Sequence, residues 1–532
     1  MSPALLDRPA PQAAARGDIF RSSAAWLPDL AKTLDPGTPA WDGDITVTDF
    51  FCGAGGSTSG LHLVPGVRVI MASNHWQLAL DTHNANHPHT DHDIESISQV
   101  DPRRYPSTTI GWFSPECTTW SVARGEECDY DDRPVQLDLL DAADDEPLPD
   151  EAKQRSRAQM EDVVRFSRHH RYLAVIVENV TDILKWKHLD RWLAEMRAEG
   201  YHHRTVILNS AFAQAYGPGA PQLRDRVYFV FWLAGQVREP NWDKWLRPRA
   251  YCPTCDSDVT ALQVIRPGKR RTMRYGPRAQ YHYRCPQTTC RGAVVHPYAL
   301  PAAAAIDLSK PGRRIGDLPR TAKKPFGVAP NTYHRIEAGL VRHVGPLLTS
   351  DGGTRRKDAA LVVPLRNNGV ARPISSHPLM TVAAGGTHHA LVMRNMTARG
   401  DQGQMSTPLD EPLRTLTAEG RQSLIDWQHA VYEYDSGHLR PVGLPLPTQT
   451  TVAGDALVRR AINVDDCLIR MLDVDEVRGG MAFAPGYILL GTQKKWKIRM
   501  LGNAVTPCSS RDLGCAVVEA ITGVDIDPVG AR

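Results

Sequence analysis

Four short stretches of polar and glycine residues follow apolar runs in the first half of the chain. They are Asp49-Phe-Phe-Cys-Gly-Ala-Gly-Gly56, Ser114-Pro-Glu-Cys-Thr-Thr-Trp-Ser121, Glu178-Asn-Val180 and Gln222-Leu-Arg-Asp-Arg226. Glycine turns that open a helix let the backbone approach a bound cofactor. A cysteine that follows a strand is a candidate nucleophile when nearby charge stabilises its thiolate. Taken singly, these residues also fit an inert buried thiol, a salt-bridged carboxylate and a solvated strand face.

An α/β rhythm positions these stretches. Apolar runs predict buried strands, and the segments after the first two predict helices. The expected strands are 45–51, 67–72, 109–113, 173–178 and 227–232, and the expected helices are 57–63 and 76–84. Strands that alternate with helices in this way favour a parallel, doubly wound sheet. Ligands gather at the strand ends of such sheets, where the polar stretches lie.

The four stretches, in this order, resemble the cytosine-5 DNA methyltransferase family. A fifth element near the C-terminus, Arg499-Met-Leu-Gly-Asn-Ala-Val-Thr-Pro507, completes the resemblance. It covers about 45–235 and 465–520. The resemblance implies an S-adenosylmethionine-dependent, Rossmann-like α/β sheet. It also implies that the wide gap before the last element holds a large, mostly β or irregular target-recognition insert.

The resemblance also implies a role for each candidate site residue. Cys117 would add to carbon 6 of a cytosine, and Glu178 would hydrogen-bond N3 and the exocyclic amine. Arg226 would hold O2, with Arg224 supporting it. The S-adenosylmethionine pocket would be formed by Phe51, Gly53, Gly55, Trp76, Asp93, Asn503 and Val505. The base would have to rotate out of the duplex, a process known as base flipping.

Two positions depart from the family pattern. Glu116 stands where a second proline usually precedes the nucleophile, which indicates a Pro-Glu-Cys subclass. A carboxylate beside Cys117 disfavours the thiolate unless it is paired or points away. His75 stands where an acidic residue commonly contacts the donor's ribose. We therefore expect weaker donor binding, or ribose hydroxyls that are held by other residues.

Two cysteine pairs predict a metal site. Cys252-Pro-Thr-Cys255 and Cys285-Pro-Gln-Thr-Thr-Cys290 fit a structural zinc ribbon, because four thiolates leave no open position on the metal. Free surface thiols are the alternative. The ribbon would present a phosphate-contacting surface formed by Arg266, Lys269, Arg270, Arg271 and Arg274. A histidine group (His83, His87, His89 and His92) is interpreted as a solvated helix end and loop.

Composition and charge limit the function classes. The 532 residues are 42% hydrophobic and 23% charged, which is typical of a globular protein. No apolar run is long enough to span a membrane, and no secretory signal is evident. The scattered cysteines favour a reducing cytoplasm over a disulfide framework. Residues 241–342 hold nineteen Lys/Arg against six Asp/Glu, which favours a polyphosphate partner over a merely solvated surface.

The expected domain organisation follows from these features. We expect a flexible arm at 1–43, a catalytic domain at 44–235, a target-recognition region at 236–465 and a closing catalytic segment at 466–532. The recognition region would contain the zinc ribbon at about 250–292 and an internal repeat at about 340–460. The repeat is Pro-Leu-x-Thr, starting at Pro346, Pro378, Pro412 and Pro445, each copy followed by an apolar close. Such copies predict short strand–turn units that stack or pair.

The sequence as a whole predicts a DNA (cytosine-5-)-methyltransferase that acts on duplex DNA. We expect a monomeric, cytoplasmic, nucleoid-associated protein of the kind that serves restriction–modification. Three alternatives stay open: an RNA cytosine-5 methyltransferase, a transferase of another one-carbon group, and a catalytically silent DNA-binding protein.

Overall fold

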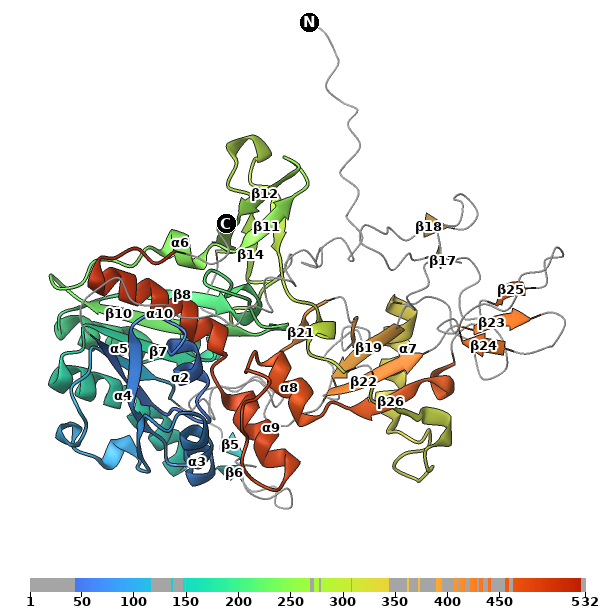
Figure 1. Ribbon diagram of the computed structural model, residues 1–532, viewed down its shortest axis with the longest axis horizontal. Helices are drawn as coiled ribbons and strands as arrows, with labels where there is room; N and C mark the ends of the chain where they lie inside the picture. Colours follow the sequence, from blue (N-terminus) through green and yellow to red (C-terminus); the bar gives the residue numbers. More distant parts are fainter. Residues whose placement is uncertain are drawn as a thin grey trace, which may run out of the picture. The chain divides into compact units, whose positions relative to one another are not determined.

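The computed structural model describes most of residues 44–343 and 463–527 and parts of the stretch between them. The described residues are 44–115, 135–136, 147–148, 150–267, 272–276, 279–307, 309–343, 361–362, 372–373, 389–394, 406–408, 411–416, 422–427, 430–433, 439–441, 455–458 and 463–527. They belong to two compact units (Figure 1). The larger unit takes in the described residues within 24–306, 412–421 and 472–532, and the other takes in those within 307–411 and 422–471.

A seven-stranded sheet forms the centre of the larger unit. Its strands are β1 (Ile45–Phe50), β2 (Val67–Ser73), β3 (Asp91–Asp93), β4 (Ile110–Phe113), β7 (Ala174–Asn179), β8 (Tyr201–Asn209) and β10 (Asp225–Leu233). The order is β3-β2-β1-β4-β7-β10-β8. The first five strands are parallel, as expected, whereas β10 is antiparallel to both β7 and β8. The sheet therefore agrees with the expected α/β architecture, apart from the direction of this one strand.

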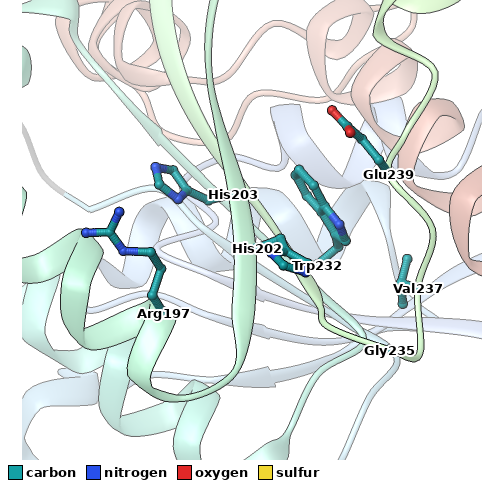
Figure 2. Close-up of a pocket in the computed structure, with 7 residues that line it drawn as sticks. All are labelled: Arg197, His202, His203, Trp232, Gly235, Val237 and Glu239. Atoms are coloured by element: carbon teal, nitrogen blue, oxygen red, sulfur yellow. The ribbon is translucent and has the colours of Figure 1, made fainter.

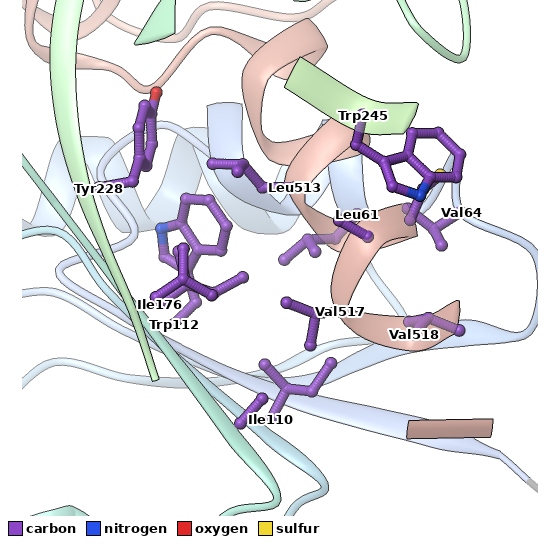
Figure 3. Close-up of a cluster of buried hydrophobic side chains, with 14 of the residues drawn as sticks. Leu61, Val64, Ile110, Trp112, Ile176, Tyr228, Trp245, Leu513, Val517 and Val518 are labelled. Atoms are coloured by element: carbon purple, nitrogen blue, oxygen red, sulfur yellow. The ribbon is translucent and has the colours of Figure 1, made fainter. Parts of the chain in front are cut away.

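Both faces of this sheet are covered, which explains why its central strands are apolar throughout. Side chains alternate between the faces along β10. Tyr228 and Val230 join the core that α2 (Gly56–Leu61) and α10 (Pro507–Thr522) cover (Figure 3). Phe229 and Phe231 make edge-to-face contacts with Trp192 of α5 (Leu189–Ala198) on the other face. The same face receives α4 (Asp150–His170), whose Phe166 contacts Phe50.

The C-terminal segment and one repeat copy complete the larger unit. Helices α8 (Val474–Gly480) and α9 (Lys494–Asn503) precede α10, and α3 (Gln77–Asn86) follows β2. The third Pro-Leu-x-Thr copy forms β21 (Leu413–Arg414), which pairs in parallel with β9 (Gln222–Leu223). The Leu413 N–H donates to Pro221 O at 2.8 Å, and Thr415 Oγ1 donates to Leu223 O at 2.9 Å. This repeat copy therefore lies against the Gln-Leu-Arg-Asp-Arg element.

Residues after β10 form a small sheet within the same unit. It comprises β11 (Arg249–Cys252), β12 (Ser257–Thr260), β13 (Leu262–Ile265), β14 (Tyr281–Arg284) and β15 (Val294–Pro297), preceded by α6 (Trp242–Leu246). The order is β12-β11-β15-β14-β13, and each strand is antiparallel to its neighbours. Cys252 ends β11, Cys255 lies in the turn between β11 and β12, and Cys285 and Cys290 follow β14, so we call this sheet the cysteine ribbon.

The second unit is built on antiparallel strands and one helix. Its main sheet has the order β16-β26-β22-β19-β20, and a smaller sheet joins β23 (Ala430–Glu433) to β24 (Leu439–Pro441) and β25. The apolar closes of the four repeats lie in β17 (Leu361–Val362), β19 (His389–Arg394), β22 (Gln422–Trp427) and β25 (Asp455–Val458). Strands β19 and β22 pair with each other, with Leu391 opposite Ile425. The described copies therefore agree with the expected strand units.

The remaining elements of the second unit surround a small core. They are β16 (Arg313–Arg314), β18 (Arg372–Pro373), β20 (Ser406–Pro408), β26 (Leu468–Met471) and α7 (Pro330–His343). Ile336 and Leu340 of α7 are fully buried with Ile425 of β22. Among all described helices, none is long and apolar enough to cross a membrane.

Candidate active site

Glu178 and Arg226 form an ion pair where two neighbouring strands of the sheet meet. Glu178 lies next to the end of β7, and Arg226 is the second residue of antiparallel β10. Glu178 is the register partner of Tyr228, so Arg226, two residues earlier, leaves the same face. Arg226 Nε lies 2.9 Å from Glu178 Oε1, and the side chains are 14% and 10% exposed. The two predicted catalytic residues therefore lie together in a site with limited access to solvent.

The environment of Glu178 favours its protonated form. Burial raises the pKa of Glu178 above its ordinary value, and the positive charges of Arg226 and Arg224 oppose this effect. The net direction is upward. A raised pKa makes it easier for the carboxyl group to take up a proton, and in its protonated form the group can donate a hydrogen bond to a ring nitrogen. Such a donor is suited to binding the N3 edge of a cytosine.

Arg224 holds the backbone of two distant segments. Its side chain is only 2% exposed. The guanidinium donates to Leu416 O at 3.1 Å, and to Gly502 O and Ala504 O at 3.0 Å each. These carbonyls belong to the residue that follows the repeat copy beside β9 and to the C-terminal end of α9. Arg224 is thus a positioning residue for the predicted donor pocket, next to an arginine that faces the site.

The glycine turn after β1 leaves room for a ligand at one position. Phe51 and Gly53 both adopt left-handed backbone conformations, with φ values of 57° and 54°. A Cβ on Gly53 would have no atom within 4 Å, whereas one on Gly55 would lie 2.5 Å from Tyr487 Oη. The space beside Gly53 therefore fits a bound cofactor. The space beside Gly55 is filled by Tyr487, so packing of the C-terminal segment explains that glycine.

Asp49, which the sequence did not single out as a site residue, is buried under the same turn. It accepts hydrogen bonds from Ser57 Oγ at 2.5 Å and Thr58 Oγ1 at 2.8 Å, both at the start of α2. Its other oxygen, Oδ1, has no hydrogen-bond partner among the described residues. Burial raises the pKa of Asp49 to about 7, and the two hydroxyl donors act in the opposite direction. A proton on Asp49 therefore stabilises the turn.

The histidine group corrects one sequence interpretation, because it is not uniformly solvated. His83 is fully buried and contacts Thr58 Oγ1 at 3.0 Å and His92 Nε2 at 2.8 Å. His87 contacts Ser59 Oγ at 3.2 Å. Burial lowers the pKa of both His83 and His87. These rings are neutral parts of the packing between α2 and α3, and of the four only His89 is fully exposed.

Trp76 and Asp93, two predicted donor-pocket residues, are each engaged by neighbours. Arg499 lies over the Trp76 ring, 4.8 Å from its centre, and the Trp496 ring meets it edge-on at 6.1 Å. Asp93 accepts hydrogen bonds from Arg104 at 2.6 Å and Tyr105 Oη at 2.8 Å. The amino group of a bound adenine would therefore have to share the Asp93 carboxylate oxygens with Arg104 and Tyr105.

The C-terminal residues of the predicted donor pocket differ in exposure. Asn503, the last residue of α9, is exposed, whereas Val505 is 5% exposed. The Val505 carbonyl lies so close to Gly56 that a Cβ there would approach it to 2.0 Å. The turn after α9 therefore packs directly on the first residue of α2. Asn503 keeps its side chain accessible to a ligand.

The predicted nucleophile Cys117 and the preceding Glu116 lie outside the described residues, as do Lys269, Arg270 and Arg271 of the basic set. The chain leading to Cys117 is described as far as Pro115. The Ser114 N–H donates to Phe50 O at 3.1 Å, and Trp112 Nε1 donates to Ser114 Oγ at 2.9 Å. The exit from β4 is therefore fixed beside the glycine turn.

The four predicted metal ligands come together on the cysteine ribbon. The ligand atoms of Cys252, Cys255, Cys285 and Cys290 all lie within 4.8 Å of one another. The Cys252–Cys290 and Cys255–Cys285 sulfur pairs are each 3.9 Å apart, and these cysteines are free thiols. A tetrahedral zinc with bonds of about 2.3 Å needs sulfurs roughly 3.8 Å apart. The donor set therefore fits zinc in both chemistry and size.

A surface hollow lies elsewhere on the sheet and takes no part in the candidate site. It encloses about 590 Å³ and is lined by Arg197, His202, His203, Trp232, Gly235, Val237 and Glu239 (Figure 2). Trp232 is near the end of β10, whereas Arg226 is near its start. Six residues of extended strand separate the two positions by about 20 Å.

Comparison with known proteins identifies a family over the first part of the catalytic region. Residues 45–139 and 150–251 match the model of the C-5 cytosine-specific DNA methylase family. No curated protein matches the chain. Among solved structures, similarity is found to the Entamoeba histolytica methyltransferase EhMeth (10% identity, 90% of this chain and 99% of that chain, TM-score 0.41). It is also found to a putative DNA modification methyltransferase encoded within an E. coli prophage (11%, 90% and 99%, 0.40) and to S. pombe Dnmt2 methyltransferase (12%, 90% and 98%, 0.41).

Proposed function

We propose that this protein methylates carbon 5 of cytosine in duplex DNA. The proposal starts from the match of residues 45–139 and 150–251 to the model of the C-5 cytosine-specific DNA methylase family. The methyl donor is S-adenosylmethionine. The observation that carries the proposal is the contact between Glu178 and Arg226, which are 2.9 Å apart and largely buried, because together they offer a carboxyl group and a guanidinium to the edge of a base.

The proposed reaction divides the chemistry between a nucleophile and two polar groups. The Cys117 thiolate forms a bond to carbon 6 of an extruded cytosine, and electron density moves to carbon 5. The protonated Glu178 donates to N3 and thereby stabilises the density that builds up on the ring. Arg226 binds O2. Bound S-adenosylmethionine would supply the methyl group to carbon 5 and leave as its thioether. The carbon 5 proton would then pass to a base or a water molecule as the bond to Cys117 breaks and the thiolate is released.

Charge on the ribbon and its flanks supports a nucleic acid as the substrate. Residues 241–342 hold nineteen basic residues against six acidic ones. Arg266 directly follows β13, and Arg274 lies within the loop between β13 and β14; both are exposed. Exposed arginines of this kind bind phosphate groups and fix the register of a duplex. We assign them to contacts with the DNA backbone.

Expression in a host without its own cytosine methylation tests the substrate and the reaction together. Mass analysis of hydrolysed DNA and RNA should find 5-methylcytosine in DNA from cells that express the wild type. Cells that express Arg226→Ala serve as the matched control and should show none. Methylated cytosine in RNA alone would show that the substrate is RNA. Another one-carbon group on cytosine would show that the transferred group is not methyl, and unmodified bases would indicate a catalytically silent protein.

We also propose that Cys252, Cys255, Cys285 and Cys290 bind a structural zinc ion. The sulfur spacing of 3.9 Å and the absence of a fifth ligand within the described cluster support this assignment. A zinc ion with four thiolate ligands has no open position, so it would stabilise the ribbon and take no part in methyl transfer.

A further inference from the structure

We infer that the cysteine ribbon positions the Glu178–Arg226 pair, and that Tyr281 is the residue through which it does so. This inference rests on the proposed function, because it gives the ribbon a role in the same reaction. It adds a positioning residue that neither the family match nor the sequence motifs indicate.

The first contact joins the ribbon to Asp225, the first residue of β10, which lies between Arg224 and Arg226. Tyr281 Oη donates to Asp225 Oδ1 at 2.5 Å, and the Tyr275 N–H donates to Asp225 Oδ2 at 3.2 Å. A third donor, Asn209 Nδ2 of the neighbouring strand, lies 2.7 Å from Asp225 Oδ1. Both oxygens of Asp225 are thus held, and two of these three donors come from the ribbon.

Holding Asp225 fixes the place where Arg226 leaves the sheet. Asp225 and Arg226 are consecutive in β10, so their side chains leave opposite faces. A bond from Arg226 to the backbone oxygen of Asp225, at 3.0 Å, further couples the two residues. If Asp225 lost its ribbon contact, the start of β10 could rotate or shift. The Arg226 guanidinium would then move relative to Glu178.

A second contact reaches the segment that carries Glu178. Thr272, in the loop between β13 and β14, donates a hydrogen bond to Asp182. Asp182 lies in the short helical turn Thr181–Lys185 that follows β7, and its side chain is paired with Lys185 at 3.4 Å. One hairpin therefore contacts Asp225, directly before Arg226, and Asp182, shortly after Glu178.

The hairpin rests on the catalytic sheet through a buried aromatic group. Tyr281 and Tyr283 are at most 1% exposed. Phe212, which follows β8, meets the rings of Tyr275 and Tyr283 edge-on at 4.8 and 5.4 Å. Gln263 Nε2 also donates to Ile207 O of β8 at 2.9 Å. The hairpin is thereby packed against the strand next to β10.

The thiolate cluster lies at the end of the same strand as Tyr281. Strand β14 ends at Arg284, and Cys285 is the next residue. Cys285 is a predicted ligand together with Cys252, on the neighbouring part of the ribbon sheet. A metal that holds these sulfurs therefore also fixes the strand that presents the Tyr281 hydroxyl to Asp225.

Tyr281→Phe tests the inference, because it removes one hydroxyl and leaves the ring in place. Tyr298→Phe is the matched control: its hydroxyl bonds Asp258 on the exposed side of the ribbon, away from β10. Hydrogen exchange followed by mass spectrometry should show faster exchange at 222–230 in Tyr281→Phe only. Its kcat should fall at least about tenfold, with the donor KM unchanged and zinc still bound.

A pH profile separates positioning from a general loss of stability. Arg226 lowers the pKa of Glu178, so a displaced Arg226 should move the limb of the kcat profile that depends on Glu178 to higher pH. Wild-type exchange and wild-type kcat in Tyr281→Phe would overturn the inference, as would faster exchange with unchanged kcat. If exchange increases but the wild type methylates no cytosine, the proposed function fails while the ribbon contact stands.

Discussion

The Arg224 guanidinium donates a hydrogen bond to the backbone oxygen of Gly502, a residue 278 positions later in the sequence. Two residues further along the same motif, Arg226 instead pairs with Glu178 in the site. The two arginines of one short motif thus have different roles: Arg224 supports the backbone, and Arg226 faces the site. The first prediction tests this difference.

Arg224→Ala should lower the free energy of unfolding by about 2–4 kcal/mol, because three buried carbonyl oxygens lose their donor. Binding of S-adenosylmethionine should weaken with it, since the Gly502–Ala504 turn loses its support. Denaturant titration and calorimetry measure both effects. Arg226→Ala is the comparison: it should abolish methyl transfer while donor binding stays near that of the wild type. Unchanged donor affinity in Arg224→Ala would contradict the positioning role.

Substitution of two glycines, one in the turn after β1 and one at the start of α2, should affect different properties: donor affinity for Gly53 and stability for Gly56. Gly53→Ala faces open space, so its left-handed backbone should cost only about 1–2 kcal/mol of stability. Its added methyl group should instead obstruct the donor and reduce affinity at least tenfold, on the order of 1.4 kcal/mol. Gly56→Ala should mainly destabilise the fold, because its Cβ would approach Val505 O to 2.0 Å. Thermal melts and donor titration distinguish the two outcomes, and full donor affinity in Gly53→Ala would place the donor elsewhere.

Asp49→Asn should change the pH dependence of stability. Folding raises the pKa of Asp49 from 3.8 to about 7, so its contribution is fully present below 3.8 and lost as pH rises to about 7. The variant has no such loss. Its stability relative to the wild type should therefore increase by about 3 kcal/mol between about pH 5 and about pH 8.

The difference between Asp49→Asn and the wild type is the quantity to measure, by urea denaturation without donor. Neutral His83 and His87 have lowered pKa values and give the opposite slope in both proteins, so their contribution cancels. A difference that does not vary with pH would show that Asp49 is ionised in the folded protein throughout.

Cys252→Ser should remove the zinc ion and lower the melting temperature. Metal analysis of the purified wild type should give one zinc per chain, and the variant should give less than half of that. Cys467→Ser is the control, because Cys467 is a buried thiol of the other unit and lies outside the ligand set. It should retain its zinc. Wild-type protein that is purified without metal and melts at the same temperature after zinc is added would refute the assignment.

Cys117→Ser should abolish methyl transfer to cytosine, whereas Glu116→Pro should retain it. The first substitution removes the thiolate, and the second restores the residue more usual before the nucleophile in the resembling family. Radiolabel transfer from the donor to DNA measures both. Equal activity in Cys117→Ser and wild type would end the proposed chemistry.

The sequence predicted the central strands well and one strand direction poorly. Runs such as Ala174–Asn179 are apolar on both faces, and such runs predict buried strands without further information. Strand direction could not be predicted in the same way, because the side chains of β10 alternate between the two faces of the sheet whether the strand is parallel or antiparallel. Strand β8, Tyr201–Asn209, also went unpredicted, since its first half is largely polar and exposed at the edge of the sheet.

The site was predictable where residue type dictates the chemistry. Four cysteines in two pairs indicated their own cluster, and Glu178 with Arg226 followed from the resemblance. Asp225 and Tyr281 were not predictable, because their contact joins segments 56 residues apart that only the fold brings together. His83 carried a usable signal: it follows Ala79 and Leu80 by four and three residues and so shares their buried helix face.

The repeat copy beside β9 has a consequence for how the chain can diversify. Leu413 and Arg414 return to the larger unit between two stretches that build the other one. The second unit therefore draws on two separate stretches of chain, within 307–411 and 422–471. A change of length by one repeat period within either stretch would leave the pairing of β21 with β9 in place, so the second unit can vary while the strand before Arg224 keeps its neighbour.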